Sequence, residues 1–217
     1  MAKLYFLGGE NVATRDARDI NLRAFQDAGG SPRVLVFAWA HASFSKDYRR
    51  RKRVFDYFKC LGASVVDFAE FSDAPEEIAR TILDSDLIYI TGGLASALIQ
   101  RLRERKVDSL IREYDGVIVG RSAGALALCK RCVVTDRNKR QAKIVAGLGE
   151  ANLCIKVHYK PSMDKVLIGL SKEEQIYAVP ARSALVYENS SLSFEGDLFL
   201  FENGGKILLK NAGKRLA

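Results

Sequence analysis

One stretch decides the fold of this chain: Gly116-Val117-Ile118-Val119-Gly120-Arg121-Ser122-Ala123-Gly124-Ala125-Leu126-Ala127-Leu128. A β-branched run leads into a Gly-x-Ser-x-Gly turn, and small residues of helical character follow. Such a strand–turn–helix holds its serine in a strained conformation, exposed at the carboxyl end of a sheet. Gly120 and Gly124 have no Cβ atom, so the strand and the helix can approach closely. The stretch predicts an α/β fold with Ser122 as a nucleophile; the alternative is a glycine-bracketed turn with a solvated serine.

Strand-like and helical segments alternate up to this turn. Strands are expected at 3–7, 33–38, 64–68, 86–90 and 116–119, and helices at 16–28, 47–61, from 72–77 onward, 94–105 and 107–114. This rhythm is typical of a doubly wound, mostly parallel sheet flanked by helices. Beyond the turn, extra short strands are expected at 142–146, 153–158, 175–179, 183–187, 191–194, 198–201 and 206–209, with a helix at 163–170. Because no linker or repeat interrupts the pattern, residues 1–217 are expected to form a single α/β domain.

Two loops follow neighbouring strands where doubly wound sheets bind their ligands, beyond the carboxyl ends of the strands. Thr91-Gly92-Gly93 follows the fourth strand, and Ser122 follows the fifth. The backbone amides of Gly93 and Ala123 are therefore candidates for a two-donor oxyanion hole. A tight strand–helix turn, which also favours glycine, is the alternative reading of Gly92-Gly93.

A serine nucleophile needs a base, usually histidine, and the chain has two histidines. His158 comes after Ser122, in the chain order of hydrolases with this turn, so we prefer it to His41. Asp136 lies between Ser122 and His158 and is our candidate for orienting the imidazole. Its surroundings are polar, so a solvated turn aspartate is the alternative. Weaker candidates are Glu150 and Asp164.

The chain is basic, with a formal charge of +8 and its densest basic run at 49–53. Tyr48, Val54, Phe55 and Phe58 have the spacing of one apolar helical face, with the charges mostly on the other. A basic run of this kind usually forms a solvated helix face. We therefore expect no nucleic-acid partner.

Cysteine usage and hydropathy bear on location and cofactors. Four cysteines, at 60, 129, 132 and 154, are typical of free thiols in a reducing compartment. Cys129 and Cys132 form a lone CxxC, expected at the far end of the helix after Ser122, without the second pair of ligands that zinc requires. We expect structural cysteines, no metal and no cofactor. No stretch approaches the roughly 20 apolar residues of a membrane span, and the N-terminus does not read as a signal peptide. We therefore expect a cytoplasmic protein with no membrane partner.

Together these segments resemble the peptidase E (aspartyl dipeptidase) and cyanophycinase family, serine peptidases on a fold related to class I glutamine amidotransferases. The segment from Gly120 to Ala125 is similar to the family's Ser-Ala-Gly-Ala nucleophile signature. Thr91-Gly92-Gly93 resembles its Gly-Gly loop, and Val157-His158-Tyr159 resembles its histidine–aromatic pair. The first strand, ending in Gly8-Gly9, is also similar, so the resemblance covers most of the chain.

The resemblance implies a serine peptidase that cleaves short peptides beside an acidic residue. Ser122 would be the nucleophile and His158 the base, and Asp136 lies near the position of the third residue of peptidase E. Gly93 and Ala123 would supply the oxyanion hole, and Gly92 would adjoin the substrate. Side chains that could hold an acidic substrate are Arg121 and Arg182, with Arg137 and Lys160 as further candidates. A homodimer is a candidate assembly.

Two departures from the family pattern concern the substrate. Leu94-Ala95 follows the Gly-Gly pair where the family usually carries a polar residue, and the turn at 179–182 has no acidic residue. Both bear on substrate specificity and leave the nucleophile and the base untouched. Two other functions stay open, a non-catalytic binding or regulatory protein on the same fold and a cyanophycinase-like hydrolase. A glutamine amidotransferase proper would carry cysteine in place of Ser122.

Overall fold

A seven-stranded sheet forms the centre of the computed structural model, which describes residues 2–41, 48–135 and 141–210. Its strand order is β11-β10-β1-β5-β4-β2-β3. The parallel strands are β1 (Lys3–Leu7), β5 (Val117–Arg121), β4 (Leu87–Ile90), β2 (Arg33–Phe37) and β3 (Val65–Ala69). Two antiparallel strands, β10 (Ala184–Glu188) and β11 (Ser191–Glu195), extend the sheet beyond β1. The predicted mostly parallel α/β sheet is confirmed.

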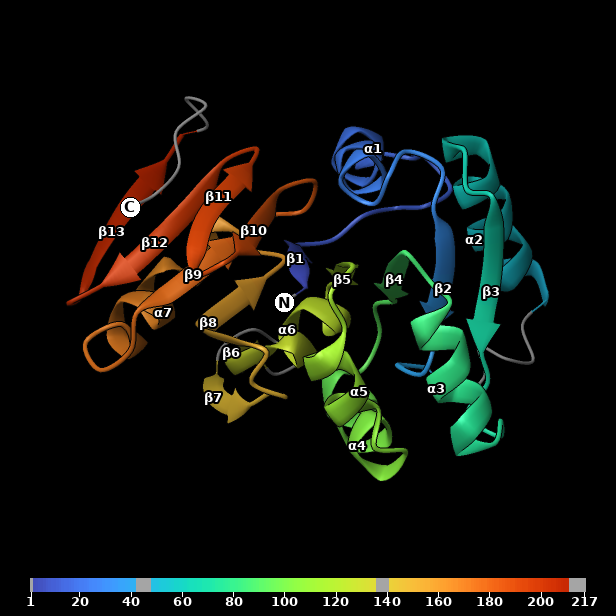
Figure 1. The fold of residues 1–217 in the computed structure, drawn as a ribbon. Coiled ribbons are helices and arrows are strands. Elements are labelled where there is room, and N and C mark those ends of the chain that lie inside the picture. The colour runs from blue at the N-terminus through green and yellow to red at the C-terminus, as the bar shows by residue number, and fades with distance from the viewer. Residues whose placement is uncertain (1, 42–47, 136–140, 211–217) are drawn as a thin grey trace.

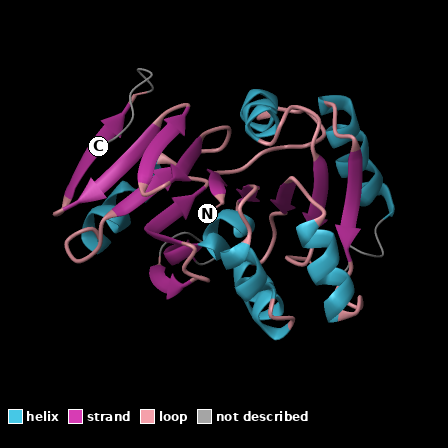
Figure 2. Cartoon of the chain, in the orientation of Figure 1, coloured by secondary structure: helices cyan, strands magenta, loops and turns pink. Residues whose placement is uncertain are grey.

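Helices cover both faces of this sheet (Figures 1 and 2). One face packs against α1 (Arg18–Asp27) and α2 (Tyr48–Leu61). The other packs against α3 (Pro75–Leu83), α4 (Ala95–Glu104), α5 (Val107–Glu113) and α6 (Ala123–Leu128). The two-residue period of a strand explains the arrangement: in β1, Leu4 and Phe6 enter one core and Tyr5 and Leu7 the other. Strands buried on both faces read as continuous apolar runs, which is why the sequence predicted them.

A second, six-stranded sheet follows the Ser122 turn, with the order β13-β12-β9-β8-β6-β7. Its strands are β6 (Cys129–Thr135), β7 (Ala142–Ala146), β8 (Ala151–Val157), β9 (Ile176–Val179), β12 (Leu198–Glu202) and β13 (Gly205–Leu209). Between β8 and β9 lie the 3₁₀ turn η2 (Pro161–Met163) and α7 (Asp164–Leu170). Ile155 of β8 and Val179 of β9 share one apolar core with Ile118 of β5, so the two sheets pack against a common interior.

The Cys-x-x-Cys segment was predicted at the end of the helix that follows Ser122, and this prediction was wrong. The helix α6 ends at Leu128, and Cys129 and Cys132 lie on β6. Val133 and Val134 follow in the same strand, and β-branched residues favour strands. Cys129 Sγ donates a hydrogen bond to the Ala125 carbonyl at 3.2 Å. All cysteines in the described part of the chain are free thiols, and Cys60 is the exposed one.

The basic helix α2 departs from the predicted apolar face. Val54 and Phe58 are buried, but Tyr48 is 74% and Phe55 is 41% exposed. Tyr57 and Leu61 complete the buried face instead, at the spacing of successive helical turns. Within the basic run, Arg51 pairs with Glu70, and its guanidinium lies 4.5 Å from the centre of the Phe68 ring.

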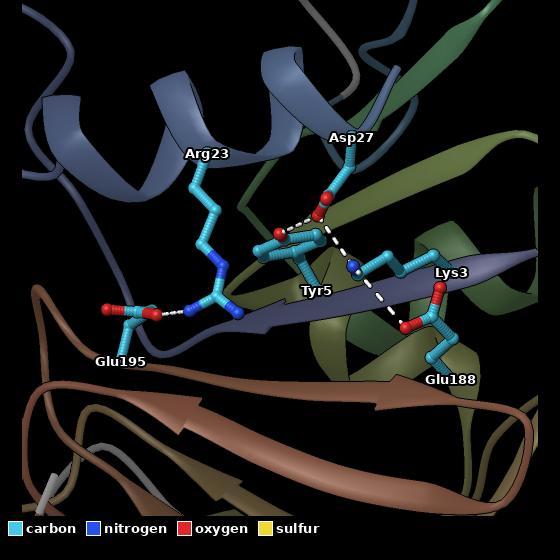
Figure 3. Close-up of polar contacts among 6 residues, drawn as sticks. All are labelled: Lys3, Tyr5, Arg23, Asp27, Glu188 and Glu195. Atoms are coloured by element: carbon cyan, nitrogen blue, oxygen red, sulfur yellow. Dashed lines mark hydrogen bonds and ion pairs between the residues drawn. The ribbon is translucent and has the colours of Figure 1, made fainter. Parts of the chain in front are cut away.

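A cluster of charged residues joins α1 to β1 and to the β10–β11 hairpin (Figure 3). Lys3 Nζ lies 2.8 Å from Asp27 and 3.4 Å from Glu188, and the Tyr5 hydroxyl donates to Asp27. Burial, with the hydrogen bond to Asp27, raises the pKa of Tyr5, which keeps this hydroxyl a donor. Arg23 of α1 pairs with Glu195 of β11. These contacts fix α1 across the antiparallel edge of the sheet.

Within residues 2–41, 48–135 and 141–210, no helix has the length and apolar character needed to cross a lipid bilayer.

Candidate active site

Ser122 occupies the sharp turn between β5 and α6. Its backbone has φ 52° and ψ −106°, a conformation that costs a non-glycine residue about 1–3 kcal/mol. Two hydrogen bonds hold it there: the Ser122 amide donates to Leu7 O at 2.9 Å, and Leu126 N donates to Ser122 O at 3.0 Å. A Cβ atom on Gly124 would lie 2.4 Å from Ile90 O, so only glycine allows this close approach. The strained turn predicted from the sequence is thus present, and Ser122 is half-buried at the carboxyl edge of the sheet.

His158 reaches Ser122 from the second sheet. It directly follows β8, also at φ 52°, and its Nε2 lies 2.7 Å from Ser122 Oγ. The His158 amide donates to Gly8 O at 3.1 Å, and the next amide, of Tyr159, donates to Val179 O at 3.2 Å. The structure therefore brings together the two residues predicted as nucleophile and base. His41 lies instead at a pocket beyond the ends of β2 and β3.

The His158 imidazole packs directly against Gly9, and we call Gly9 and the residues that hold it the seat of the imidazole. A Cβ atom on Gly9 would lie 2.3 Å from His158 Cε1 and 2.6 Å from Nδ1, well inside van der Waals contact. Gly9 has φ 152°, and its carbonyl accepts a hydrogen bond from Arg182 N at 2.8 Å. The sequence marked Gly8-Gly9 only as the end of the first strand. The structure shows that the imidazole occupies the space that any side chain at Gly9 would fill.

The Gly92-Gly93 loop packs against Ser122. A Cβ atom on Gly92 would come within 3.2 Å of Ser122 Cβ, so the loop and the serine are in direct contact. Leu94 N donates to Ala40 O at 3.0 Å and anchors the loop to the end of β2. Among the described residues, neither the Gly93 nor the Ala123 amide donates a hydrogen bond to the surrounding turns. Ala123 is next to Ser122 along the chain, and Gly93 directly follows the glycine that contacts Ser122.

The third member of the predicted triad, Asp136, lies outside the described residues. Both weaker candidates have other partners. Glu150 pairs with Arg112 at 3.6 Å, and Asp164 pairs with Lys206 at 2.7 Å and accepts from the Tyr159 hydroxyl at 2.6 Å. Desolvation is the largest single influence on the pKa of Asp164 and raises it, but the hydrogen bonds from Lys206 and Tyr159 and the charge of Lys206 together lower the pKa below its usual value. Glu150 and Asp164 are thus both engaged in ion pairs away from His158 in the interactions described.

The predicted substrate-binding arginines lie in different surroundings. Arg121 is half-buried, and its Nε would lie 3.4 Å from a Cβ atom on Gly92, so its side chain adjoins the glycine loop. Arg182 is exposed and has a left-handed backbone with φ 64°. Lys160 is exposed, and Arg137 lies outside the described residues. Arg121 is therefore the candidate arginine that adjoins the Gly92-Gly93 loop.

Glu10 forms a polar network that sequence reasoning missed. Its Oε1 accepts a hydrogen bond from the Tyr89 hydroxyl, and its Oε2 accepts from Asn21 Nδ2 at 2.9 Å and from the Tyr57 hydroxyl at 3.4 Å. Burial raises the pKa of Glu10, while the Tyr89 hydrogen bond and the charge of Arg121 act in the opposite direction. The network links the residue after Gly9 to β4, α1 and α2. An acidic residue directly after the Gly8-Gly9 pair was the signal that could have revealed it.

A metal site was also sought in the described residues. They contain no group of three or more His, Cys, Asp or Glu side chains with the geometry to hold a metal ion. The arrangement around Ser122 is instead that of a hydroxyl, an imidazole and backbone amides, which suits nucleophilic attack on a carbonyl.

Comparison with known proteins adds independent findings. The family model of peptidase family S51 matches residues 15–194. The uncharacterized peptidase Lin0382 of Listeria innocua is 23% identical over 145 residues, which are 61% of this chain and 69% of that protein. A peptidase from an acI-B1 Actinobacterium superposes with a TM-score of 0.74 at 19% identity, covering 100% of this chain and 97% of that one. A candidate peptidase E protein from Listeria monocytogenes EGD-e superposes with a TM-score of 0.69 at 18% identity, covering 90% and 98%.

Proposed function

Because the chain belongs to peptidase family S51 and is a serine peptidase, we propose that Ser122 is its nucleophile and His158 its general base. One observation carries the proposal: the 2.7 Å between Ser122 Oγ and His158 Nε2, two groups from different sheets. A nucleophile and its base need this hydrogen-bonding distance for proton transfer. Both residues also hold strained backbone conformations, which cluster at functional sites.

The proposed reaction follows from these positions. Ser122 Oγ attacks the scissile carbonyl carbon while His158 Nε2 takes its proton, and the imidazolium then donates that proton to the leaving amine. Water repeats the cycle on the acyl-enzyme and releases the acid. The amides of Gly93 and Ala123 stabilise the oxyanion, and losing one such donor typically costs about 10²–10³ in kcat. Asp136 is our proposal for the residue that orients the imidazole.

We propose short peptides as substrates, with an acidic residue beside the scissile bond. The support for this acidic preference is Arg121, whose guanidinium adjoins Gly92, and Arg182, which is exposed two residues after Pro180. Charge-assisted hydrogen bonds from arginine suit a carboxylate well. Gly92 would line the same side of the site because it contacts Ser122.

The experiment that tests this function is labelling with a fluorophosphonate probe. We expect the probe to modify the peptide that contains Ser122, as identified by mass spectrometry, and to modify neither Ser122→Ala nor denatured protein. Hydrolysis of short peptides should fall in parallel as labelling proceeds. A folded protein that takes up no probe would contradict the proposal and would favour a non-catalytic binding protein on the same fold.

We also propose a cytoplasmic location. Its support is that Cys129, Cys132 and Cys154 are buried free thiols, as is usual in a reducing compartment. A homodimer stays a prediction, and sedimentation or light scattering of the purified protein would test it.

A further inference from the structure

An apolar pocket opens beside the Gly92-Gly93 loop, where helix α4 faces the β6–β7 hairpin. Its volume is about 610 Å³, and its apolar wall is built from Leu94, Ala95, Ile99, Val134 and Val145. Ligand pockets usually have volumes of about 300–1,000 Å³ and such a lining, with a few polar groups at defined places. The size and lining of this pocket therefore suit a large apolar group.

The repeat of side chains along α4 and along the strands β6 and β7 explains which residues form the walls of the pocket. Ala95 and Ile99 are four residues apart and share one face of α4, while Leu98 and Leu102 are fully buried. On the hairpin, Val134 pairs with Lys143, and Val145 lies two residues further on the same face. At one end, Arg103 Nη2 donates to Gly147 O at 2.6 Å and ties α4 to the residue after β7. The walls of the pocket are thus formed by a helix and two paired strands.

Leu94 joins this pocket to the catalytic residues. It is 64% exposed, which is unusual for a leucine beside an apolar pocket, and it directly follows Gly93. Its backbone is held by the hydrogen bond to Ala40 O, and Gly92, two residues earlier, contacts Ser122. Since consecutive Cα atoms are about 3.8 Å apart, Leu94 lies within about 8 Å of Gly92 along the chain. The pocket therefore begins two residues along the chain from the glycine that contacts Ser122.

Lys143 adds a positive charge to the rim of the pocket. It lines the pocket and is exposed, and no hydrogen bond or ion pair to a described residue engages its ammonium group. A residue that leaves after cleavage of a dipeptide carries a free α-carboxylate as well as its side chain. An apolar wall with one cation at its rim is complementary to both parts of such a residue.

We propose that this pocket binds the residue on the leaving side of the scissile bond, with a large apolar side chain such as Leu or Phe against Leu94 and Val145. Lys143 meets the free carboxylate of that residue. The inference rests on the proposed function, since it places a substrate residue beside Ser122, and it makes the protein selective for dipeptides that end in an apolar residue.

The test compares dipeptides that share their first residue and end in Leu, Phe, Ala, Asp or Lys. We expect kcat/KM for Leu and Phe to exceed that for Ala by about 10- to 100-fold, as expected for burial of a large apolar side chain. Leu94→Ser should lower the Leu-to-Ala ratio about tenfold. Leu83→Ser is the matched control, because Leu83 is 80% exposed at the end of α3 and adjoins the amino ends of the strands.

Two further variants keep the inference falsifiable if Leu94→Ser disturbs the neighbouring Gly93. Val145→Arg, on the opposite wall, should also lower the Leu-to-Ala ratio, whereas Ile207→Arg on β13 should leave it unchanged. Lys143→Gln should raise KM several-fold for dipeptides with a free carboxylate and leave KM for their C-terminal amides unchanged.

The outcomes separate this inference from the proposed function. If the fluorophosphonate labels Ser122 but the Leu-to-Ala ratio is near one, or is equal in wild type, Leu94→Ser and Val145→Arg, the inference is overturned while the proposed function stands. If these variants dissociate an oligomer in light scattering with unchanged selectivity, the pocket is an interface between copies, and the inference is also overturned. If Ser122 is not labelled and no dipeptide is cleaved, both fail.

Discussion

Ser122 and His158 share a left-handed backbone, with φ 52° in each, but they reach it by different routes. The turn at Ser122 is dictated locally, because a Cβ atom on Gly120 would lie 2.7 Å from Ala125 N, so only glycine lets β5 and α6 meet so closely within five residues of sequence. The position of His158 depends on Gly8 and Gly9, which belong to the other end of the chain and to the other sheet. The proposed nucleophile is therefore positioned by local sequence, whereas the proposed base is placed by tertiary packing.

This difference determines which substitutions should change activity. Substitutions near Ser122 change a motif that is readable in the sequence, whereas distant residues that form the seat of His158 control activity without touching Ser122. Gly9 packs against the imidazole, Arg182 N holds Gly9 O, and Glu10 continues from Gly9 into the network with Tyr89. Activity should thus depend on the seat as well as on the imidazole itself, with smaller losses expected at the seat.

The largest effect is expected from removing the imidazole. His158→Ala should lower kcat by about 10⁴ or more, since members of a nucleophile–base pair act as a unit. The fold should survive, because His158 is exposed and its backbone hydrogen bonds do not need the side chain. Steady-state kinetics with circular dichroism would measure both. His41→Ala is the control, and a comparable loss there would contradict the pairing of Ser122 with His158.

The seat itself is tested by Gly9→Ala. The added Cβ atom would meet the imidazole at 2.3 Å and displace it, and misplacing a catalytic group by about 1 Å can cost about 10²-fold in rate. Gly29→Ala is a matched control, because Gly29 also has a positive φ, of 89°, but no atom within 4 Å of the added Cβ. Both variants should lose about 1 kcal/mol of stability in urea unfolding. Equal activity in the two would show that Gly9 is not a seat.

Glu10→Gln probes the network behind the seat, with a smaller expected loss of about tenfold in kcat and little change in KM. Burial raises the pKa of Glu10 in the folded state, so its folded form binds a proton more tightly than its unfolded form. Wild type therefore loses stability as pH rises from about 4.3, the ordinary pKa of glutamate, through the folded pKa.

Glutamine does not titrate, so the stability of Glu10→Gln relative to wild type should increase across the same pH interval. Urea unfolding at several pH values, with Glu173→Gln as an exposed control, would measure this. A pH-independent difference would mean that folding does not raise the pKa of Glu10, and it would contradict the burial of its carboxyl group in the network.

The smallest effect is expected at Arg182, whose amide supports Gly9 from a left-handed backbone with φ 64°. Arg182→Gly keeps the amide and removes the strain, so thermal unfolding should show a gain of at most about 1 kcal/mol. If the Arg182 side chain holds an acidic substrate, KM should rise several-fold for a peptide with Asp and not for its Asn counterpart. Equal KM changes for the two peptides would remove Arg182 from the substrate site and leave Arg121.

Much of this architecture could be predicted from the sequence. The alternating strands and helices of the first half, the strained turn at Ser122 and the Gly92-Gly93 loop depend on periods and glycines within a few residues, and the structure has all of them. The buried face of α2 was harder to predict from the sequence. Tyr48 and Phe55 fit an apolar pattern but are exposed, because the position of α2 on the sheet turns Tyr57 and Leu61 inward instead.

The sequence by itself determined the α/β class and the strained turn that exposes Ser122, because these arise from local sterics and from the apolar runs of buried strands. Only the tertiary structure decided which strands joined which sheet: β9 pairs in the second sheet, β10 and β11 return to the first, and β12 pairs with β9 again. That distribution brings His158 onto Gly9, surrounds Glu10 with donors and leaves the pocket beside Leu94. Each of these depends on contacts between residues far apart in the chain, whose pairing no local pattern specifies.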